Sequence, residues 1–221
     1  MEDLAKIEKM AQDEFDIAKK EKSIAKDSKL EAKQELKKAK IREDLVNNEF
    51  ELAKIKERLY EKTKKYINKK MAIKDDLGYS ENALAIELNH AKYNEKESEI
   101  QKEIAAIHKK IAKVEKEIAE ERLKLIDERL NVAKEREKLA KKQSNYVKLV
   151  KSSALEEKIE KEKENYLSQN KDLNNAEKDV VERNKAIMKL QNELADRKKD
   201  LSLKLAEREK IRPEKQNVQI E

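Results

Sequence analysis

The two histidines are the side chains best suited to metal binding or acid–base chemistry. His90 and His108 are eighteen residues apart, so on a helix they share one face but lie about 27 Å apart and cannot bind one metal ion. Glu87 precedes His90 with the Glu-x-x-His spacing of a di-iron ligand pair. Ala105 stands where His108 would need the matching glutamate. We therefore expect no metal site and no cofactor.

Other catalytic chemistry is poorly supplied. The chain has no cysteine and a single glycine, which excludes thiol catalysis, thiolate metal sites, disulfides and a glycine-rich phosphate loop. Carboxylates are abundant, but on a narrow helical surface most of them lie in water with ordinary acidity. We expect the protein not to be an enzyme.

Basic side chains are concentrated in two segments. Residues 54–74 hold nine basic residues against two acidic ones, and residues 134–151 hold seven against two. Such patches bind the phosphates of anionic lipid or nucleic acid in a salt-dependent way, or simply keep a protein soluble. The candidate contacts to an anionic surface are Lys62, Lys64, Lys65, Lys69, Lys70, Lys138, Lys141, Lys142 and Lys148.

Exposed aromatic residues are the remaining candidate contacts. We expect Tyr79, in the first turn, to be a contact at the tip of the molecule, and Tyr93 to be exposed as well. Apolar residues outside the main apolar series described below are candidates for protein contact. These are Phe15, Leu36, Phe50, Leu123 and Leu130.

The composition limits which fold can position these residues. Charged residues make up 46% of the 221 residues and aromatic residues 4%, too little apolar material for a compact domain of this length. Such a chain is disordered or buries its apolar residues along narrow helical seams. Gly78 and Pro213 are the one glycine and the one proline, so little in the sequence breaks a helix.

Seven-residue periodicity favours the helical alternative. The central segment has large apolar residues at every seventh position from Ile104 to Tyr146, and a series of smaller residues one position later, from Leu84 to Val147. The C-terminal segment has a large series from Ile159 to Leu201. Sustained heptads make helices wind around each other in a left-handed coil.

The N-terminal segment also has two series. The small series runs from Leu4 to Tyr60 and is mostly alanine, and the large series runs from Met10 to Tyr66 but is interrupted at Glu31 and Lys38. We expect both series to be core. Because alanine lets helix axes approach closely, we expect the first two helices to form a tight pair, in register about residue 78 or 79, with the third helix in their groove.

The fold we predict is all-α: an elongated antiparallel three-helix coiled-coil bundle, a rod about 100 Å long at 1.5 Å per residue. Helix one covers residues 3–76, helix two 81–150 and helix three 154–211, with a frayed tail at 212–221. Gly78 ends the first helix, and Ser80 caps the second. Ser153 and Glu156 form a capping box for the third, which stops before Pro213.

The leading functional hypothesis is a non-catalytic structural or scaffold protein that binds other proteins along its surface or at its tips. We expect a homodimer or higher oligomer. Three long antiparallel helices with clustered lysines are similar in layout to a BAR domain, and that resemblance implies binding to an anionic membrane surface. We rank nucleic-acid binding below both alternatives. The chain as given would be cytoplasmic, or in a cell envelope if an export signal preceded Met1.

Overall fold

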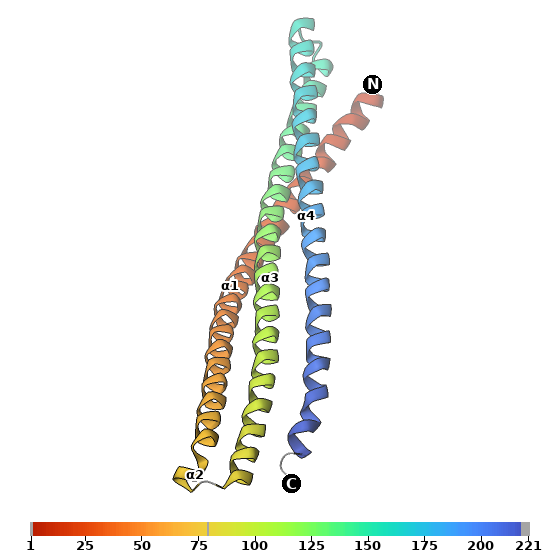
Figure 1. The fold of residues 1–221 in the computed structure, drawn as a ribbon. Coiled ribbons are helices and arrows are strands. Elements are labelled where there is room, and N and C mark those ends of the chain that lie inside the picture. Colours follow the sequence, from red (N-terminus) through yellow and green to blue (C-terminus); the bar gives the residue numbers. More distant parts are fainter. Residues whose placement is uncertain (1, 79, 218–221) are drawn as a thin grey trace. The chain divides into compact units, whose positions relative to one another are not determined.

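The protein is built from helices. The computed structural model describes residues 2–78 and 80–217, which form α1 (Glu2–Ala72), α2 (Lys74–Leu77), α3 (Glu81–Lys151) and α4 (Glu156–Asn217), with no strand among them (Figure 1). The predicted all-α, three-helix bundle is confirmed. The length of the rod stays a prediction.

The chain divides into two units that each take one part of every long helix. The first unit contains Met1–Lys37 and Glu117–Leu190, and the second contains Lys38–Lys116 and Gln191–Glu221. In each unit, ion pairs join α3 to α1 on one side and to α4 on the other. Helix α3 is therefore the central helix of both units.

The register between α1 and α3 agrees with the prediction to within about one residue. In the first unit Lys22 Nζ lies 3.0 Å from a carboxylate oxygen of Glu137. In the second unit Lys102 Nζ lies 2.8 Å from Glu57. The midpoint of both pairs along the sequence falls between residues 79 and 80, so each part of α1 pairs antiparallel with the part of α3 that is equally far from the first turn.

The apolar series of α3 are mostly buried, as predicted. Members of the large series (Ile104, Ile111, Ile118, Leu125 and Leu139) and of the small series (Leu84, Ala91, Ala112, Ala119, Ala133, Ala140 and Val147) are at most 8% exposed. Ser98 is the polar member of the small series, and its hydroxyl donates a 2.7 Å hydrogen bond to the carbonyl of Glu95. The large series of α4 is buried or half-buried as well.

The large series of α1 is exposed, so the prediction that it is core was wrong. Its apolar members Met10, Ile17, Ile24, Leu45, Leu52, Leu59 and Tyr66 are 47–64% exposed. The alanines one position later, including Ala11, Ala18, Ala25 and Ala32, are 0–7% exposed. Successive helical residues are turned by about 100°, so α3 covers the alanine face of α1 and leaves the neighbouring series uncovered.

The first turn contains a break that the sequence did not reveal. Helix α1 ends at Ala72 rather than near Asp76, Ile73 leaves the helical conformation, and the short helix α2 follows. Gly78 then takes the predicted left-handed conformation, with φ of 68°, and its N–H donates to the carbonyl of Lys74. Ser80 caps α3 as predicted, accepting a 3.5 Å hydrogen bond from the N–H of Ala83.

The second turn is built differently from the predicted capping box. Ser153 is left-handed, with φ of 50°, and its N–H donates to Val150 while that of Ala154 donates to Leu149. This pattern is a Schellman motif that ends α3, so Ser153 belongs to the end of one helix and not to the start of the next. Helix α4 consequently starts at Glu156, two residues later than predicted.

Pro213 does not end the last helix. Helix α4 continues to Asn217, so the expected stop at residue 211 was wrong, and residues 218–221 of the predicted tail lie outside the described residues. Proline removes one backbone hydrogen bond and displaces the turn before it. Only about one turn of helix follows Pro213, so the displacement at the proline affects little of the bundle.

Candidate protein-binding groove

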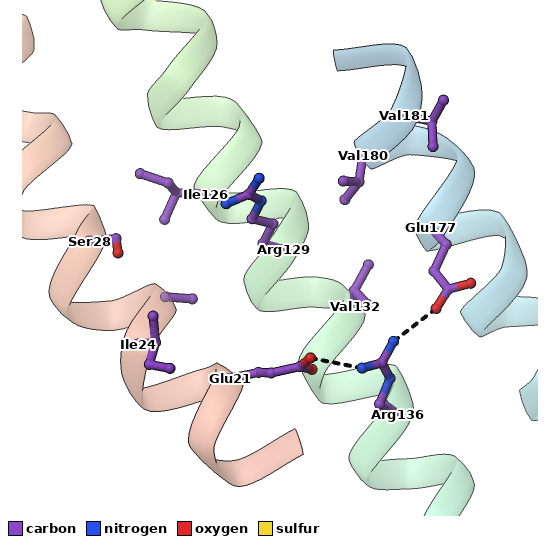
Figure 2. Close-up of a pocket in the computed structure, with 11 residues that line it drawn as sticks. Glu21, Ile24, Ser28, Ile126, Arg129, Val132, Arg136, Glu177, Val180 and Val181 are labelled. Atoms are coloured by element: carbon purple, nitrogen blue, oxygen red, sulfur yellow. Dashed lines mark hydrogen bonds and ion pairs between the residues drawn. The ribbon is translucent and has the colours of Figure 1, made fainter. Parts of the chain in front are cut away.

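The first unit has an apolar groove over α3. It encloses about 510 Å³ and is walled by Ile24 of α1 and Val181 of α4, which are 64% and 51% exposed. Val132 of α3 lies between these walls (Figure 2). The groove exists because α1 and α4 bind the same stretch of α3 from two sides.

Arg136 of α3 closes one end of this groove by joining both flanking helices. Its guanidinium donates to Glu21 of α1 at 2.8 Å and to Glu177 of α4 at 3.0 Å (Figure 2). A guanidinium has several donors in a fixed plane, so one arginine can bridge two carboxylates. Arg136 therefore sets the spacing between the two walls.

A second arginine, on α4, binds α3 elsewhere in the same unit. Arg183 of α4 donates to Glu128 at 2.8 Å and to Glu121 at 2.7 Å, both on α3. Hydrogen bonds to Glu128 and then to Glu121 raise the pKa of this arginine above its usual range. Val180 and Val181 lie three and two residues before Arg183 on α4, so these bonds hold the second wall in place.

The α1 side is held by a doubly bound carboxylate. Glu137 of α3 accepts hydrogen bonds from Lys141, on its own helix, and from Lys22 of α1 at 3.0 Å. These two bonds lower the pKa of Glu137 to about 2. The carboxylate therefore stays charged at all ordinary pH values and ties α1 to α3 near the first wall.

The lining of this groove is mostly aliphatic. Of its charged side chains, Glu21, Arg136 and Glu177 are paired with each other, and Arg129 is exposed. Within the described residues, no three His, Cys, Asp or Glu side chains come together to hold a metal ion. Such a surface can bury the aliphatic side chains of another helix and so remove them from water.

The basic segment 134–151 is largely neutralised by its own unit. Lys138 pairs with Glu135 at 2.7 Å, Lys141 with Glu137 at 2.9 Å, and Lys142 with Glu162 of α4 at 3.7 Å. Lys148 is exposed. Three of its four candidate lysines thus have carboxylates beside them, which weakens this segment as an anion-binding surface.

The basic segment 54–74 keeps an exposed cationic stripe. Lys64 pairs with Glu95 and Lys70 with Glu87, both on α3. Lys62, Lys65 and Lys69 are exposed, and within the described residues no ion pair involves them. Lys62, Lys65 and Lys69 are spaced three and four residues apart, which puts all three on one face of α1.

Neither tyrosine that we predicted as a surface contact is confirmed. Tyr79 lies outside the described residues. Tyr93 is 8% exposed, so the expectation that it is a surface contact was wrong, whereas Tyr66 of the exposed α1 series is 61% exposed. The suggested protein contacts Phe15, Leu36, Phe50, Leu123 and Leu130 are half-buried. Lysine ammonium groups lie 4.3 Å from the ring of Phe15 and 4.4 Å from that of Phe50.

The fold and the groove define an all-α bundle of long helices with an uncovered apolar surface. No protein-family model matches the chain, and no curated protein matches it. No helix in the described part of the chain is apolar over a long enough stretch to cross a membrane. The apolar groove itself escaped sequence reasoning, because heptad spacing marks Ile24 as a contact residue without showing whether its contact lies inside the chain.

Proposed function

We propose that this protein is a non-catalytic scaffold that binds other proteins through helix-to-helix contacts. In the first unit the binding surface is the groove between Ile24 and Val181, and the ligand is an amphipathic helix that presents aliphatic residues at heptad spacing. Helix-in-groove binding of this kind uses residues at every third or fourth position as anchors.

One observation carries the proposal: a regular apolar series on α1 is exposed. Scattered exposed apolar residues are ordinary on soluble proteins, but a series repeated along one face is typical of an interaction site. Burying one aliphatic side chain is worth about 1.5–3 kcal/mol. A few such residues in register therefore give a specific helix enough binding free energy.

Site-specific photo-crosslinking in cells that express the chain naturally tests this proposal. A photoreactive residue in place of Ser28, which lines the groove, should form an adduct with a discrete protein. The same residue in place of Lys33, exposed on the same helix outside the groove, is the matched control. The double variant Ile24→Asp with Val181→Asp should abolish the Ser28 adduct. Equal adducts at both positions, or an adduct that survives the double variant, would contradict the proposal.

A second candidate function is binding to an anionic membrane surface through segment 54–74. Its support is the exposed stripe formed by Lys62, Lys65 and Lys69, to which Arg58 adds a fourth charge four residues before Lys62. Each basic residue near an anionic surface contributes about 1 kcal/mol at low salt. Sedimentation with phosphatidylserine vesicles should fall in the triple variant Lys62→Gln, Lys65→Gln and Lys69→Gln. A triple variant that sediments like the parent chain would remove this candidate.

A further inference from the structure

In the second unit, α1 has two heptad seams on nearly opposite faces. One seam faces α3 and includes Val46, Phe50, Ala53, Tyr60 and Ile67, all buried or half-buried. The other includes Ile41, Leu45, Leu52, Ile55, Leu59 and Tyr66, all 52–61% exposed. Alternating steps of four and three residues along the second seam, completed by Asn48 and Lys62, are the spacing of a coiled-coil interface. We call it the outer seam.

We propose that the outer seam of residues 41–66 is a homodimer interface, in which α1 of a second copy of this chain lies antiparallel along it. This inference does not depend on the groove of the first unit. It names one occupant for the outer seam, and the charges beside the seam specify both the orientation and the register.

The register follows from the apolar layers. When Leu52 faces Ile55 of the second copy, Leu59 faces Asn48 and Tyr66 faces Ile41. Leu45 then faces Lys62, whose long aliphatic stem can cover a leucine while its ammonium reaches water. Every layer in this register contains at least one apolar residue, and each occurs twice because the dimer has a two-fold axis.

The charges flanking the outer seam are complementary in this register. In antiparallel coiled coils, residues at equivalent flanking positions of the two helices face each other. Here Glu51 faces Arg58, Glu49 faces Lys56, and Asp44 faces Lys65. All three pairings join opposite charges, and the two-fold axis doubles them to six ion pairs.

These flanking side chains are available for a partner. All six are exposed, and Glu51 pairs with Lys54 of its own helix at 2.8 Å. Within the described residues, no ion pair involves the remaining five. These are Asp44, Glu49, Lys56, Arg58 and Lys65. Across the helix, by contrast, Glu57 and Lys64 on the seam facing α3 are already paired with Lys102 and Glu95.

Other arrangements bring like charges together. A shift of seven residues one way places Glu51 opposite its own copy, and a shift the other way does the same to Arg58. A parallel pair in register would bury Lys62 against Lys62 among the apolar layers of the interface. Like-charge contacts of this kind select against a register or an orientation.

Charge reversal tests the register with the full-length chain. Glu51→Arg and Arg58→Glu should each weaken the dimer roughly tenfold, because each variant makes two attractive pairs repulsive. The double variant carrying both changes restores opposite charges and should recover the parent dissociation constant. Analytical ultracentrifugation over a concentration series gives these constants. A dimer unaffected by the single changes, or a double variant as weak as the singles, would overturn the proposal.

Two further variants test the seam itself. Leu52→Asp should weaken the dimer by more than about a hundredfold, since two apolar layers are lost. Leu203→Asp, on α4 of the same unit at 62% exposure, is the matched control and should leave the dimer intact. Circular dichroism checks that both variants keep their helical content.

Disulfide trapping tests the orientation. The chain has no cysteine, so a Leu52→Cys chain mixed with an Ile55→Cys chain should form the mixed disulfide in preference to either homodisulfide. Preferred homodisulfides would instead indicate a parallel pair and overturn the proposal. A chain that is monomeric at tens of micromolar, yet sediments with phosphatidylserine vesicles through Leu52, would also overturn it and assign the outer seam to a membrane surface.

Discussion

Helices α1 and α3 have the same kind of sequence pattern and different surroundings. In α3 the neighbours Ile118 and Ala119 are 7% and 6% exposed, whereas in α1 the neighbours Ile17 and Ala18 are 47% and 0% exposed. The difference arises because α3 has a helix on each side and α1 has one covered side. Heptad spacing therefore identifies a contact surface, and the number of neighbouring helices decides whether the chain itself fills it.

The largest expected effect comes from alanine substitutions at corresponding large apolar positions of α3 and α1. Ile118→Ala should lower the free energy of unfolding by about 2–4 kcal/mol, since it leaves a cavity beside a buried seam. Ile17→Ala should change it by less than about 0.5 kcal/mol, as at other exposed positions. Urea denaturation followed by circular dichroism measures both. Equal losses would mean that the exposed α1 series is covered in the purified protein.

Replacing a buried alanine with a larger residue tests the contact between α1 and α3 by overpacking. Ala18→Leu should lower the free energy of unfolding by about 1–3 kcal/mol, because Ala18 is fully buried and the predicted close approach of α1 and α3 leaves no room for a leucine. Ala195→Leu, at an exposed position on α4, is the matched control and should be nearly neutral. If Ala18→Leu were tolerated as well as Ala195→Leu, the close approach of the two helices would be disproved.

The two turns that connect the long helices should respond in opposite directions. Gly78→Ala should cost about 1 kcal/mol, because alanine is disfavoured at the left-handed φ of 68°. Ser153→Gly should stabilise by about 0.5–1 kcal/mol, since a serine now occupies φ of 50°. Thermal unfolding midpoints report both changes. Destabilisation by Ser153→Gly would contradict the Schellman ending of α3.

The smallest expected effect is on acid stability. The pKa of Glu137 is lowered from 4.5 to about 2 by hydrogen bonds from Lys141 and Lys22. A lowered folded-state pKa stabilises the protein above the unfolded value of 4.5, and this stabilisation is lost as pH falls toward 2. The side chains are partly solvated, so we expect less than about 1 kcal/mol. Urea titrations between pH 5 and pH 2 should show a smaller loss for Glu137→Gln than for the parent chain.

Much of the fold could be predicted from the sequence, because heptads, Gly78 and Ser80 act locally. The boundaries failed where several residues compete for one role. Ser153 satisfies the pattern of a capping residue, but the carbonyls at the end of α3 also need donors, and the Schellman motif supplies them. The break at Ile73 left no sequence signal that we recognise.

The candidate surfaces were harder to predict than the fold. Sequence reasoning found the exposed lysines of segment 54–74, since three of them face away from α3. It misassigned Tyr66 and Ile24 as core and Tyr93 as surface. Which side of α1 stays open depends on where α4 binds α3, and that is a property of three segments together.

The alignment of α1 with α3 about the first turn limits how this gene can change length. A single residue inserted into α1 rotates and shifts everything beyond it, so that Lys22 and Glu137 no longer meet. Seven residues added to α1 preserve the rotation but still need seven added to α3 at the mirrored place. Viable insertions and deletions should therefore be matched multiples of a heptad, and homologues of different size should differ by such blocks.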